Sequence, residues 1–301
     1  MLLGEYAVLH GQHALVCAID RRMHVKLTPR DDERIILDSS LGHYETTVSH
    51  LESVPPFQFV LSTLLSFKKY LKHGCHIQIE SEFSDKIGFA SSAAVTVATF
   101  LAVATWCELF FSTPELIKRA RKIVRDVQGV GSGADVAACV LGGIVSYRTE
   151  PFIANKMPFT YPMTVVYSGN KTPTPIAIKH VHEKFVDRTD VFSELMKAIN
   201  GCVLQGMDAV KEKDWRKLGA MMNIQQIFMS NLLGVNTAAI DRIIELMQPQ
   251  SNLLGIKISG AGLGDCVIAL GECELDPFLL PPNAKQIRVN MSNEGMRCEK
   301  I

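Results

Sequence analysis

The order of apolar and polar positions in the first part of the chain predicts a small sheet with one helix. After Pro55 and Pro56, apolar residues recur at helical spacing on one face, which is typical of an amphipathic helix. Alternation of apolar and polar side chains indicates half-buried strands on either side of that helix. The predicted strands are residues 13–27, 34–38, 43–49 and 75–79.

The middle of the chain is predominantly helical in its spacing. Residues 93–111 form an apolar stretch that approaches the length of a membrane span, but threonines and Glu108 interrupt it, so we expect a buried helix. A second helix follows the capping sequence at 112–115, where a proline lies in the first turn, and its apolar stripe runs to Val127. The shorter elements expected next are a helix at 136–140 and a strand at 144–147.

A weakly patterned segment that contains prolines, residues 149–162, marks the expected boundary between two domains, 1–157 and 158–301. The second domain opens with a buried strand at 163–167 and a polar turn at 168–174. Helical spacing and apolar runs then predict three helices and two strands. These elements are the helices 191–211, 215–233 and 238–247, and the strands 254–258 and 267–270.

The composition is that of an ordinary globular protein and narrows the choice of partners. Hydrophobic residues make up 47% and charged residues 21% of the 301 positions, and the formal net charge is zero. Without a basic excess we expect no nucleic-acid partner. The eight cysteines are scattered with no CxxC pair, which favours free thiols in a reducing cytoplasm. The first residues do not form a secretory signal, and we expect no membrane association.

The segment 86–94, KIGFASSAA, combines a glycine-containing turn with the start of an apolar helix. Small side chains let a ligand approach the main chain, and the unpaired amides of a helix start attract anions, so the turn suits a phosphate group. Ser91 and Ser92 add hydroxyls that could cap the helix or bind magnesium. A serine-capped buried helix without any ligand is the alternative.

Two further glycine-rich turns supply complementary chemistry. In the turn at 129–135, Asp135 lies where the glycines meet an apolar helix, and it is either a helix cap or a reactive carboxylate. The turn at 257–266 lies between two strands and is either a hairpin rich in glycine or a wall of backbone N–H groups. Phosphoryl transfer needs bound phosphates, a metal ion and a group that deprotonates the acceptor hydroxyl. Three such turns in one chain therefore indicate a phosphotransferase, although no P-loop motif is present.

The order of these motifs resembles that of the GHMP kinase superfamily. The matching sequences are GEYAVLHG at 4–11, GFASSAA at 88–94, GSGADVA at 131–137 and KISGAGLGDC at 257–266. The resemblance covers essentially the whole chain. It implies an α+β fold with two lobes, an N-terminal lobe like ribosomal protein S5 that binds ATP and a ferredoxin-like C-terminal lobe, with ATP and an alcohol between them.

The resemblance also implies roles for individual residues. Asp135 would be the catalytic base, and Ser92, with Glu5, would hold Mg²⁺. Two larger groups of residues would bind the ligands, one the phosphates of ATP and the other the substrate. The ATP-binding group is Lys86, Gly88, Phe89, Ala90, Ser91, Ser92, Ala93 and Ala94, and the substrate-binding group is Glu5, His10, Ser132, Thr174, Gly260, Ala261 and Gly262.

Within the superfamily the chain is most similar to mevalonate kinases, in its length, in GEYAVLHG and in the segment 218–235. The expected reaction is direct, in-line transfer from ATP to the primary alcohol of mevalonate, a step in isoprenoid precursor synthesis. GSGADVAA and Gly264-Asp265-Cys266 favour a phosphomevalonate kinase instead, and a nucleotide-binding homologue without catalysis is the second alternative. Exposed Leu and Met helices could form a homodimer interface.

Three features depart from the mevalonate kinase pattern. A lysine usually precedes the first motif in a PGK-like sequence, and this sequence begins after that point. Phe89-Ala90 replaces Leu-Gly in the phosphate loop, so we expect a stiffer backbone there. No glutamate stands near Val124 as a second magnesium ligand.

The sequence does not decide which cation would pair with the carboxylate of the substrate. The candidates are Arg21, Lys171, Lys179 and Lys257.

Overall fold

The computed structural model describes residues 1–84 and 87–300, and the described chain divides into two compact units. The first unit contains residues 1–20, 87–88 and 141–294, and the second contains 21–84, 89–140 and 295–300. Both units combine helices with sheets, so the expected α+β fold is confirmed. Each unit is assembled from separate stretches of the sequence.

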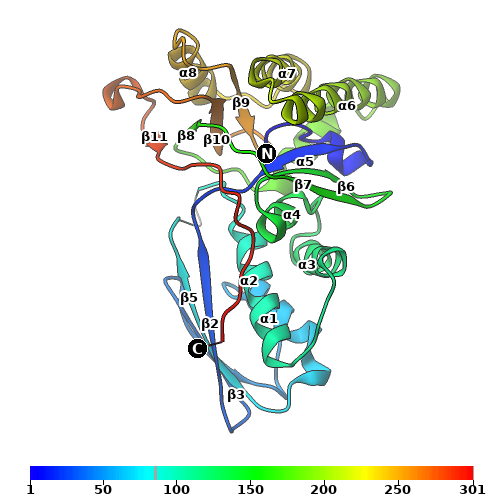
Figure 1. The fold of residues 1–301 in the computed structure, drawn as a ribbon, viewed down its shortest axis with the longest axis vertical. Helices are drawn as coiled ribbons and strands as arrows, with labels where there is room; N and C mark the ends of the chain where they lie inside the picture. The colour runs from blue at the N-terminus through cyan, green and yellow to red at the C-terminus, as the bar shows by residue number, and fades with distance from the viewer. Residues whose placement is uncertain (85–86, 301) are drawn as a thin grey trace. The chain divides into compact units, whose positions relative to one another are not determined.

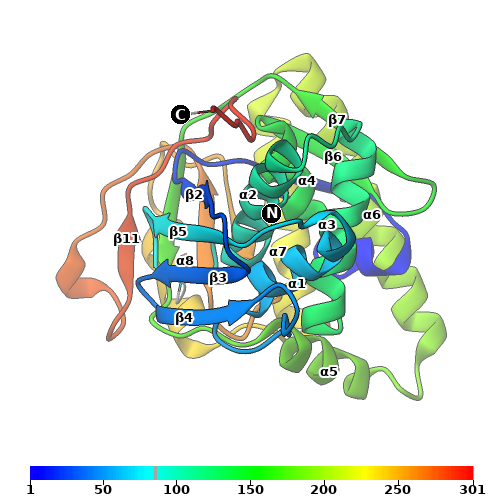
Figure 2. The same cartoon turned by 90° about the horizontal axis from the view of Figure 1, so that it is seen from below.

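The second unit contains a four-stranded sheet in the order β2-β5-β3-β4 (Figure 2). Its strands are β2 (Met23–Pro29), β3 (Arg34–Ser39), β4 (Gly42–Thr47) and β5 (Cys75–Ser81), and β3 runs parallel to β5 while the other pairs are antiparallel. Alternate residues of β3 and β5, among them Leu37 and Ile77, are fully buried, as a period of two requires of a sheet covered on one face. The helices that pack in this unit are α1 (Gln58–Ser66), α2 (Ser91–Trp106) and α3 (Thr113–Gln128), with a 3₁₀ turn η2 (Lys68–Tyr70).

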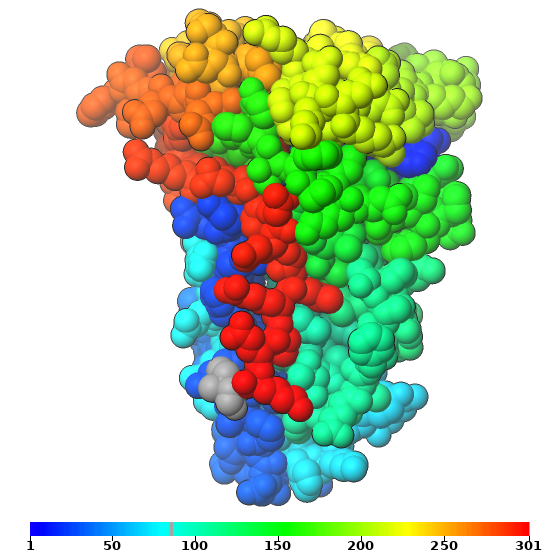
Figure 3. All heavy atoms as spheres, viewed as in Figure 1, coloured from blue at the N-terminus to red at the C-terminus, as the bar shows by residue number. Residues whose placement is uncertain are grey.

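The C-terminal segment 295–300 belongs to the second unit and follows its surface (Figure 3). The backbone N–H of Met296 donates to the carbonyl oxygen of Val140, at 3.3 Å, in the helix α4 (Ala134–Leu141). Arg22 Nη1 donates to the carbonyl oxygen of Gly295 at 2.9 Å. The end of the chain is therefore held by hydrogen bonds to residues far earlier in the sequence.

The first unit contains two antiparallel sheets (Figure 1). One is formed by β1 (Ala14–Cys17), β6 (Ile144–Arg148) and β7 (Ile153–Met157), and the other has the order β11-β8-β10-β9. The strands of the second sheet are β8 (Met163–Tyr167), β9 (Gly255–Ser259), β10 (Cys266–Leu270) and β11 (Lys285–Ile287). The helices of the first unit are α5 (Thr174–Lys184), α6 (Thr189–Glu212), α7 (Trp215–Ile227) and α8 (Ala238–Met247). The unit also contains the 3₁₀ helices η1 (Ala7–His10) and η4 (Pro277–Leu279), and the π-helix η3 (Phe228–Leu233) follows α7.

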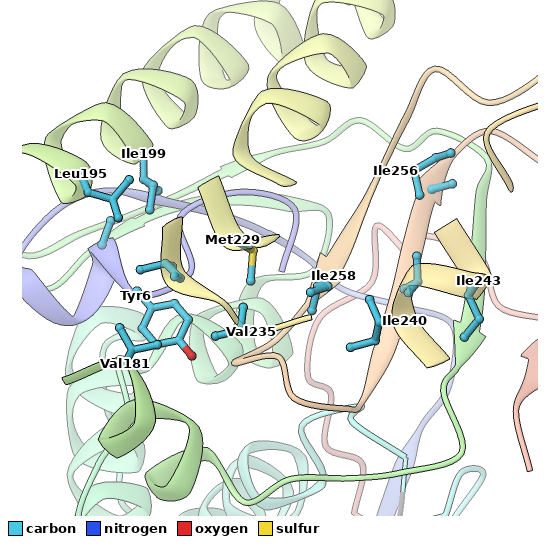
Figure 4. Packing of buried hydrophobic residues seen from close by; sticks show 14 of the residues in the cluster. Tyr6, Val181, Leu195, Ile199, Met229, Val235, Ile240, Ile243, Ile256 and Ile258 are labelled. Atoms are coloured by element: carbon cyan, nitrogen blue, oxygen red, sulfur yellow. The ribbon is translucent and has the colours of Figure 1, made fainter. Parts of the chain in front are cut away.

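The core of the first unit joins the helices to strands β8, β9 and β10 (Figure 4). Ile258 of β9 and Ile240 and Ile243 of α8 are fully buried, and Tyr6 from the N-terminal segment packs into the same cluster. Burial of such side chains stabilises the fold by about 1.5–3 kcal/mol for each large apolar residue. The N-terminal glycine turn is therefore part of the core of this unit.

The sequence predicted most of these elements, and the differences have local causes. The expected strand 13–27 is two strands, because residues 18–22 leave the first sheet before β2 begins in the other unit. The helix expected at 93–111 ends at Trp106, shortly before Glu108 adopts a left-handed conformation with φ 55°. Helix α5 and strands β7 and β11 were not predicted. The boundary at 157/158 stays a prediction, and the compact units do not follow it, since β1 pairs with β6.

The sequence predicted free thiols, and all eight cysteines are free thiols in the structure. None of the helices in the described part of the chain combines the length and apolarity that a membrane span requires.

Helix α7 approaches strand β9 through a pair of glycines, and this contact gives a test of the packing. A Cβ on Gly219 would lie 2.2 Å from the carbonyl oxygen of Leu254, and one on Gly255 would lie 2.3 Å from that of Gly219. Because backbone must move to relieve such contacts, we expect Gly219→Ala to lower the free energy of unfolding by about 1–3 kcal/mol. Urea denaturation measures the change.

Gly201 in α6 provides the matched control, because outside its chain neighbours and the adjacent backbone of its own helix no described atom lies within 4 Å of the position of its Cβ. We expect Gly201→Ala to raise the free energy of unfolding by about 0.5–1 kcal/mol through the lower entropy of the unfolded chain. Equal effects of the two substitutions would contradict the proposed close approach of α7 and β9.

Candidate active site

The first glycine turn is fixed by a buried polar cluster. The carboxylate of Glu5 is 3% exposed, and its Oε2 accepts a hydrogen bond from Gln225 Nε2 at 2.6 Å. Its Oε1 accepts a hydrogen bond from Lys257 Nζ in an ion pair. The Oε1 atom of Gln225 also accepts a hydrogen bond from the backbone N–H of Gly4, at 2.9 Å. Both oxygens of Glu5 thus have partners inside the protein, which argues against the role of metal ligand predicted for this residue.

Lys257 is the fully buried cation of the same cluster, which we call the Glu5–Lys257 cluster, with Gln225 as its third member. Burial lowers the pKa of Lys257, and the adjacent Glu5 carboxylate opposes that shift. Its ammonium group also donates to the carbonyl oxygen of Ile258. A lysine engaged in this way cannot be the cation that pairs with a substrate carboxylate, so Lys257 is removed from the candidates for that role.

Tyr6 connects the first glycine turn to the third. Its hydroxyl donates to the carbonyl oxygen of Ala261 at 2.5 Å. Burial and the neighbouring Glu5 raise the pKa of Tyr6, so the phenol remains a hydrogen-bond donor throughout the neutral range. Tyr6 itself has φ 62°, a conformation that is uncommon for residues other than glycine. The contact therefore holds the turn at 260–264 against the beginning of the chain.

The glycines of the third turn allow close approach between segments of backbone. A Cβ on Gly262 would lie 2.6 Å from the Cβ of Val235, and one on Gly264 would lie 2.9 Å from the carbonyl oxygen of Asn170. The hydroxyl of Thr172 donates to the carbonyl oxygen of Leu263 at 2.6 Å, which fixes the turn from the same side. The substrate-binding roles of Gly260, Ala261 and Gly262 stay predictions.

Asp265, at the end of this turn, was not among the site residues predicted from the sequence. It follows the glycines, is 7% exposed, and its Oδ1 has no hydrogen-bond partner among the described residues. Burial raises the pKa of Asp265 to about 6, and the charge of Lys171 opposes the shift. In the sequence, the feature that could have marked Asp265 as a candidate site residue is its position as the single carboxylate between a glycine turn and an entirely apolar strand.

The predicted phosphate loop leads into α2, whose first residue is Ser91. Ala90 at the N-cap is left-handed with φ 54°, a conformation that glycine adopts more readily, and no side chain caps the helix. The capping role expected for Ser91 and Ser92 is therefore not seen, and the first amides of α2 lack intrahelical partners. Gly88, in contrast, has no positive φ. Lys86 lies outside the described residues.

Asp135 lies in the first turn of α4 and is exposed. Ser132 Oγ accepts a hydrogen bond from the backbone N–H of Ala134 at 3.2 Å, in the turn that leads into the helix. Asp135 is the second residue of the helix, and its negative charge is favourable at a helix N-terminus. If the glycine turns serve one reaction, Asp135 should line the same pocket as the two serines of α2, and this stays a prediction.

The remaining predicted substrate residues lie at the ends of two elements in the first unit. His10 ends η1, and its ring packs edge-on against Phe192 with 4.9 Å between the ring centroids. Partial burial and the nearby His182 lower the pKa of His10, so its imidazole is neutral at physiological pH. Thr174 is the exposed first residue of α5. Substrate contacts of both residues stay predictions.

The described residues contain no group of three or more His, Cys, Asp or Glu side chains that could hold a metal ion. Mg²⁺ in enzymes that use nucleotides is commonly bound by one or two protein oxygens together with substrate phosphates and water. The hydroxyl of Ser92, half-buried in the first turn of α2, fits such a limited set of protein ligands. Of the two metal ligands predicted from the sequence, Ser92 is the one that we retain.

The Glu5–Lys257 cluster gives a test by substitution. Removing one partner leaves the other charge buried without compensation, so we expect Glu5→Gln and Lys257→Met each to lower the free energy of unfolding by about 3–5 kcal/mol. The double variant should lose less than the sum of the two, because no isolated charge remains. Chemical denaturation of all four proteins measures the coupling.

The exposed pair Lys197–Glu194, with 2.7 Å between Nζ and Oε1, is the control for this comparison of single and double variants. Glu194→Gln should change the free energy of unfolding by less than about 1 kcal/mol, since solvent screens the pair. Strictly additive effects at Glu5 and Lys257 would show that the two groups do not interact.

Two family models match the chain, one on each side of the predicted domain boundary. The model described as GHMP kinases N terminal domain matches residues 58–143, and that described as GHMP kinases C terminal matches residues 207–291, so that together they span more than half of the chain. The first match contains the phosphate loop and Asp135, and the second contains Gln225, Lys257 and the third glycine turn.

Relatives of known activity resemble the chain over its full length. The mevalonate kinase of Thermococcus sibiricus is 26% identical, covering 100% of this chain and 96% of the relative. That of Archaeoglobus fulgidus is 29% identical, covering 96% of each.

Solved structures show the same fold. A mevalonate kinase structure superposes with a TM-score of 0.76 at 22% identity, covering 97% of this chain and 96% of the other. The Lactococcus lactis galactokinase complexed with galactose gives a TM-score of 0.82 at 18% identity, covering 98% of this chain and 91% of the other. The fold, both family models and the order of the glycine turns agree: this chain belongs to the GHMP kinases.

Proposed function

We propose that this chain transfers the γ-phosphoryl group of ATP to the primary alcohol of mevalonate and so forms 5-phosphomevalonate. The observation that carries the proposal is the similarity to mevalonate kinases over the whole length of both proteins. The likeness to galactokinase and other kinases supports the fold alone, because those structures are less than 25% identical to this chain.

Binding of the ATP phosphates is assigned to the start of α2. The amides of Ser91, Ser92 and Ala93 are the first of the helix, and such groups bind anions through their free donors and the helix dipole. Ala90 and Ala93 are small, so a phosphate can approach the main chain closely. Mg²⁺, when bound with ATP, neutralises charge that develops on the transferred group, and the Ser92 hydroxyl would be its ligand from this chain.

Asp135 is assigned the role of base. Its carboxylate is exposed in the first turn of α4, and a carboxylate at that place can accept the proton of the acceptor hydroxyl or orient that hydroxyl. No covalent enzyme intermediate is needed, because positioning and charge stabilisation suffice for in-line phosphoryl transfer.

On the substrate side, the Glu5–Lys257 cluster supports binding indirectly. Glu5 and Tyr6 hold the first glycine turn in place through Lys257, Gln225 and Ala261, so we assign Glu5 to positioning the turn and not to direct contact. His10, Thr174 and Ser132 remain the proposed side-chain contacts of the acceptor. The cation for the mevalonate carboxylate is to be sought among Arg21, Lys171 and Lys179.

Phosphomevalonate kinase is the second candidate, favoured by Gly264-Asp265-Cys266 in the third motif. A coupled assay of ADP release with mevalonate or 5-phosphomevalonate as the acceptor separates the candidates. We expect release that depends on mevalonate. Release with 5-phosphomevalonate alone would support the second candidate, and nucleotide binding with no turnover on either would support a homologue without catalysis.

The role of Asp135 has its own test. Because Asn keeps the size of the side chain and removes its basicity, we expect Asp135→Asn to lower kcat by about 10²-fold or more. The affinity for ATP should stay within about twofold, since the phosphates are assigned to α2. Steady-state kinetics and equilibrium binding of a nucleotide analogue measure the two effects, with Asp126→Asn on the exposed surface of α3 as control. Unchanged kcat would refute the assignment.

A further inference from the structure

Helix α3 carries two arginines that share one face toward its C-terminal end. Arg121 and Arg125 are four residues apart, the spacing that places helical side chains next to each other, and we call them the arginine pair. No described residue forms a hydrogen bond or an ion pair with either guanidinium group. Because two adjacent positive charges repel each other, the pair by itself is unfavourable for the helix.

Other cations of the same helix have acidic partners. The side chain of Arg119 contacts Glu115 at 2.8 Å and that of Lys122 contacts Asp126 at 2.6 Å, in each case four residues along the helix. No acidic residue stands three or four positions from either member of the arginine pair. The helix itself therefore offers the pair no compensating charge.

The two arginines differ in their exposure to solvent. Arg121 is half-buried, and its Nε atom is buried with no acceptor among the described residues, although buried polar atoms normally have a partner. Arg125 is exposed in the last turn of α3, where the helix dipole favours a cation. The dipole acts within that last turn, so it does not account for Arg121, which lies one turn earlier.

The turn that follows α3 leaves open space beside the exposed arginine. Gly129 stands four residues after Arg125, and apart from the chain neighbours of this glycine no described atom lies within 4 Å of the position of a Cβ there. The Cγ atom of Arg125 lies 3.7 Å from the position of a Cβ on Gly131, so the stem of the side chain lies beside the turn. The same turn leads into α4 and Asp135, and all of these residues belong to the second unit (Figure 1).

An oxyanion has the chemistry that this arrangement lacks. A guanidinium group presents its N–H donors in one plane, in a geometry that matches two oxygens of a carboxylate or a phosphate. Such an anion would offset the repulsion between the two arginines and would supply acceptors for their donors. Its place beside the turn that carries the proposed base is also where a ligand of the kinase reaction is expected.

We propose that the arginine pair and the open space at Gly129 form a binding site for an oxyanion of a kinase ligand, either the carboxylate of the acceptor or a phosphate group. This inference rests on the proposed function. It adds Arg125 and Arg121 to the cations considered for the acceptor carboxylate, which did not include them. The interaction consists of ion pairing and hydrogen bonds, and no covalent bond forms or breaks.

Three substitutions on the exposed face of α3 test the site. Arg125→Gln removes the charge, and Arg125→Lys keeps the charge but loses the planar set of donors. Lys122→Gln is the matched control, because it removes one positive charge from the same helix at a residue that already has a partner, Asp126. Thermal melting of each variant shows whether it is folded.

Isothermal titration calorimetry provides the measurement, with mevalonate, 5-phosphomevalonate and a non-hydrolysable ATP analogue as separate ligands. We expect Arg125→Gln to raise Kd by about 10- to 100-fold for the ligand whose oxyanion occupies the site, as the loss of a hydrogen bond to a charged group implies. Arg125→Lys should raise the same Kd by less. Lys122→Gln should change each Kd by less than about twofold, since solvent screens that position.

The pattern across the ligands identifies the oxyanion. Weaker binding of mevalonate by Arg125→Gln assigns the site to the carboxylate of the acceptor. Unchanged binding of mevalonate, together with weaker binding of a phosphorylated ligand, assigns it to a phosphate group. In either case the affected Kd should rise less steeply with salt in Arg125→Gln than in the wild type, because one screened charge has been removed.

The outcomes separate the inference from the proposed function. Kd values of Arg125→Gln within about twofold of the wild type for all three ligands, or an equal loss of affinity in Lys122→Gln, overturn the oxyanion site and leave the kinase proposal intact. If Arg125→Gln does not fold, an unchanged Kd of Arg125→Lys for every ligand overturns the site. Absence of turnover by the wild type on either acceptor overturns the proposed function alone, and a folded wild type that binds none of the ligands overturns both.

Discussion

The buried ion pair between Glu5 and Lys257 is the constraint on which the site depends. These residues are 252 positions apart in the sequence, and both charges are withdrawn from water. Moving two charges into an apolar interior costs several kcal/mol per ion unless each is paired and hydrogen-bonded. Gln225 donates a hydrogen bond to Glu5, and the carbonyl oxygen of Ile258 accepts one from Lys257, so each charge is hydrogen-bonded as well as paired. The N-terminal turn must therefore lie against β9, and with Tyr6 on Ala261 it also lies against the third glycine turn.

The glycines of the motifs act in two different ways. In the third turn they let backbone segments of the protein approach one another, as Gly262 does at Val235 and Gly264 at Asn170. At Gly88 the missing side chain makes room for Asp265, and the left-handed conformation of the phosphate loop is adopted by Ala90. A left-handed alanine costs roughly 1 kcal/mol relative to glycine, so the departure from the usual Leu-Gly of the loop carries an energetic cost in this chain.

The sequence predicted the elements whose burial follows a simple period and the turns rich in glycine. It did not predict α5, β7 or β11, which have few fully buried residues and so show no regular pattern of core positions. The role of Glu5 as a magnesium ligand followed from the family resemblance alone and stays a prediction, against which its buried contacts argue. Its partners on α7 and β9 could not be identified, since pairing across such a distance in sequence leaves no local pattern. Asp265 was visible as a residue, and only its burial and its unpaired oxygen distinguish it as a candidate.

The path of the chain through the two units has a consequence for how the protein acquires its structure during synthesis. The chain begins in one unit, passes to the other and back, and ends with residues 295–300 hydrogen-bonded to Arg22 and to α4. Domains usually fold as they leave the ribosome, the N-terminal one first. Here the ion pair of Glu5 forms only after Lys257 has emerged, and the hydrogen bonds of Gly295 and Met296 to Arg22 and α4 form later still. The apolar core that Tyr6 shares with Ile258 is therefore completed late in synthesis, after most of the chain has been made.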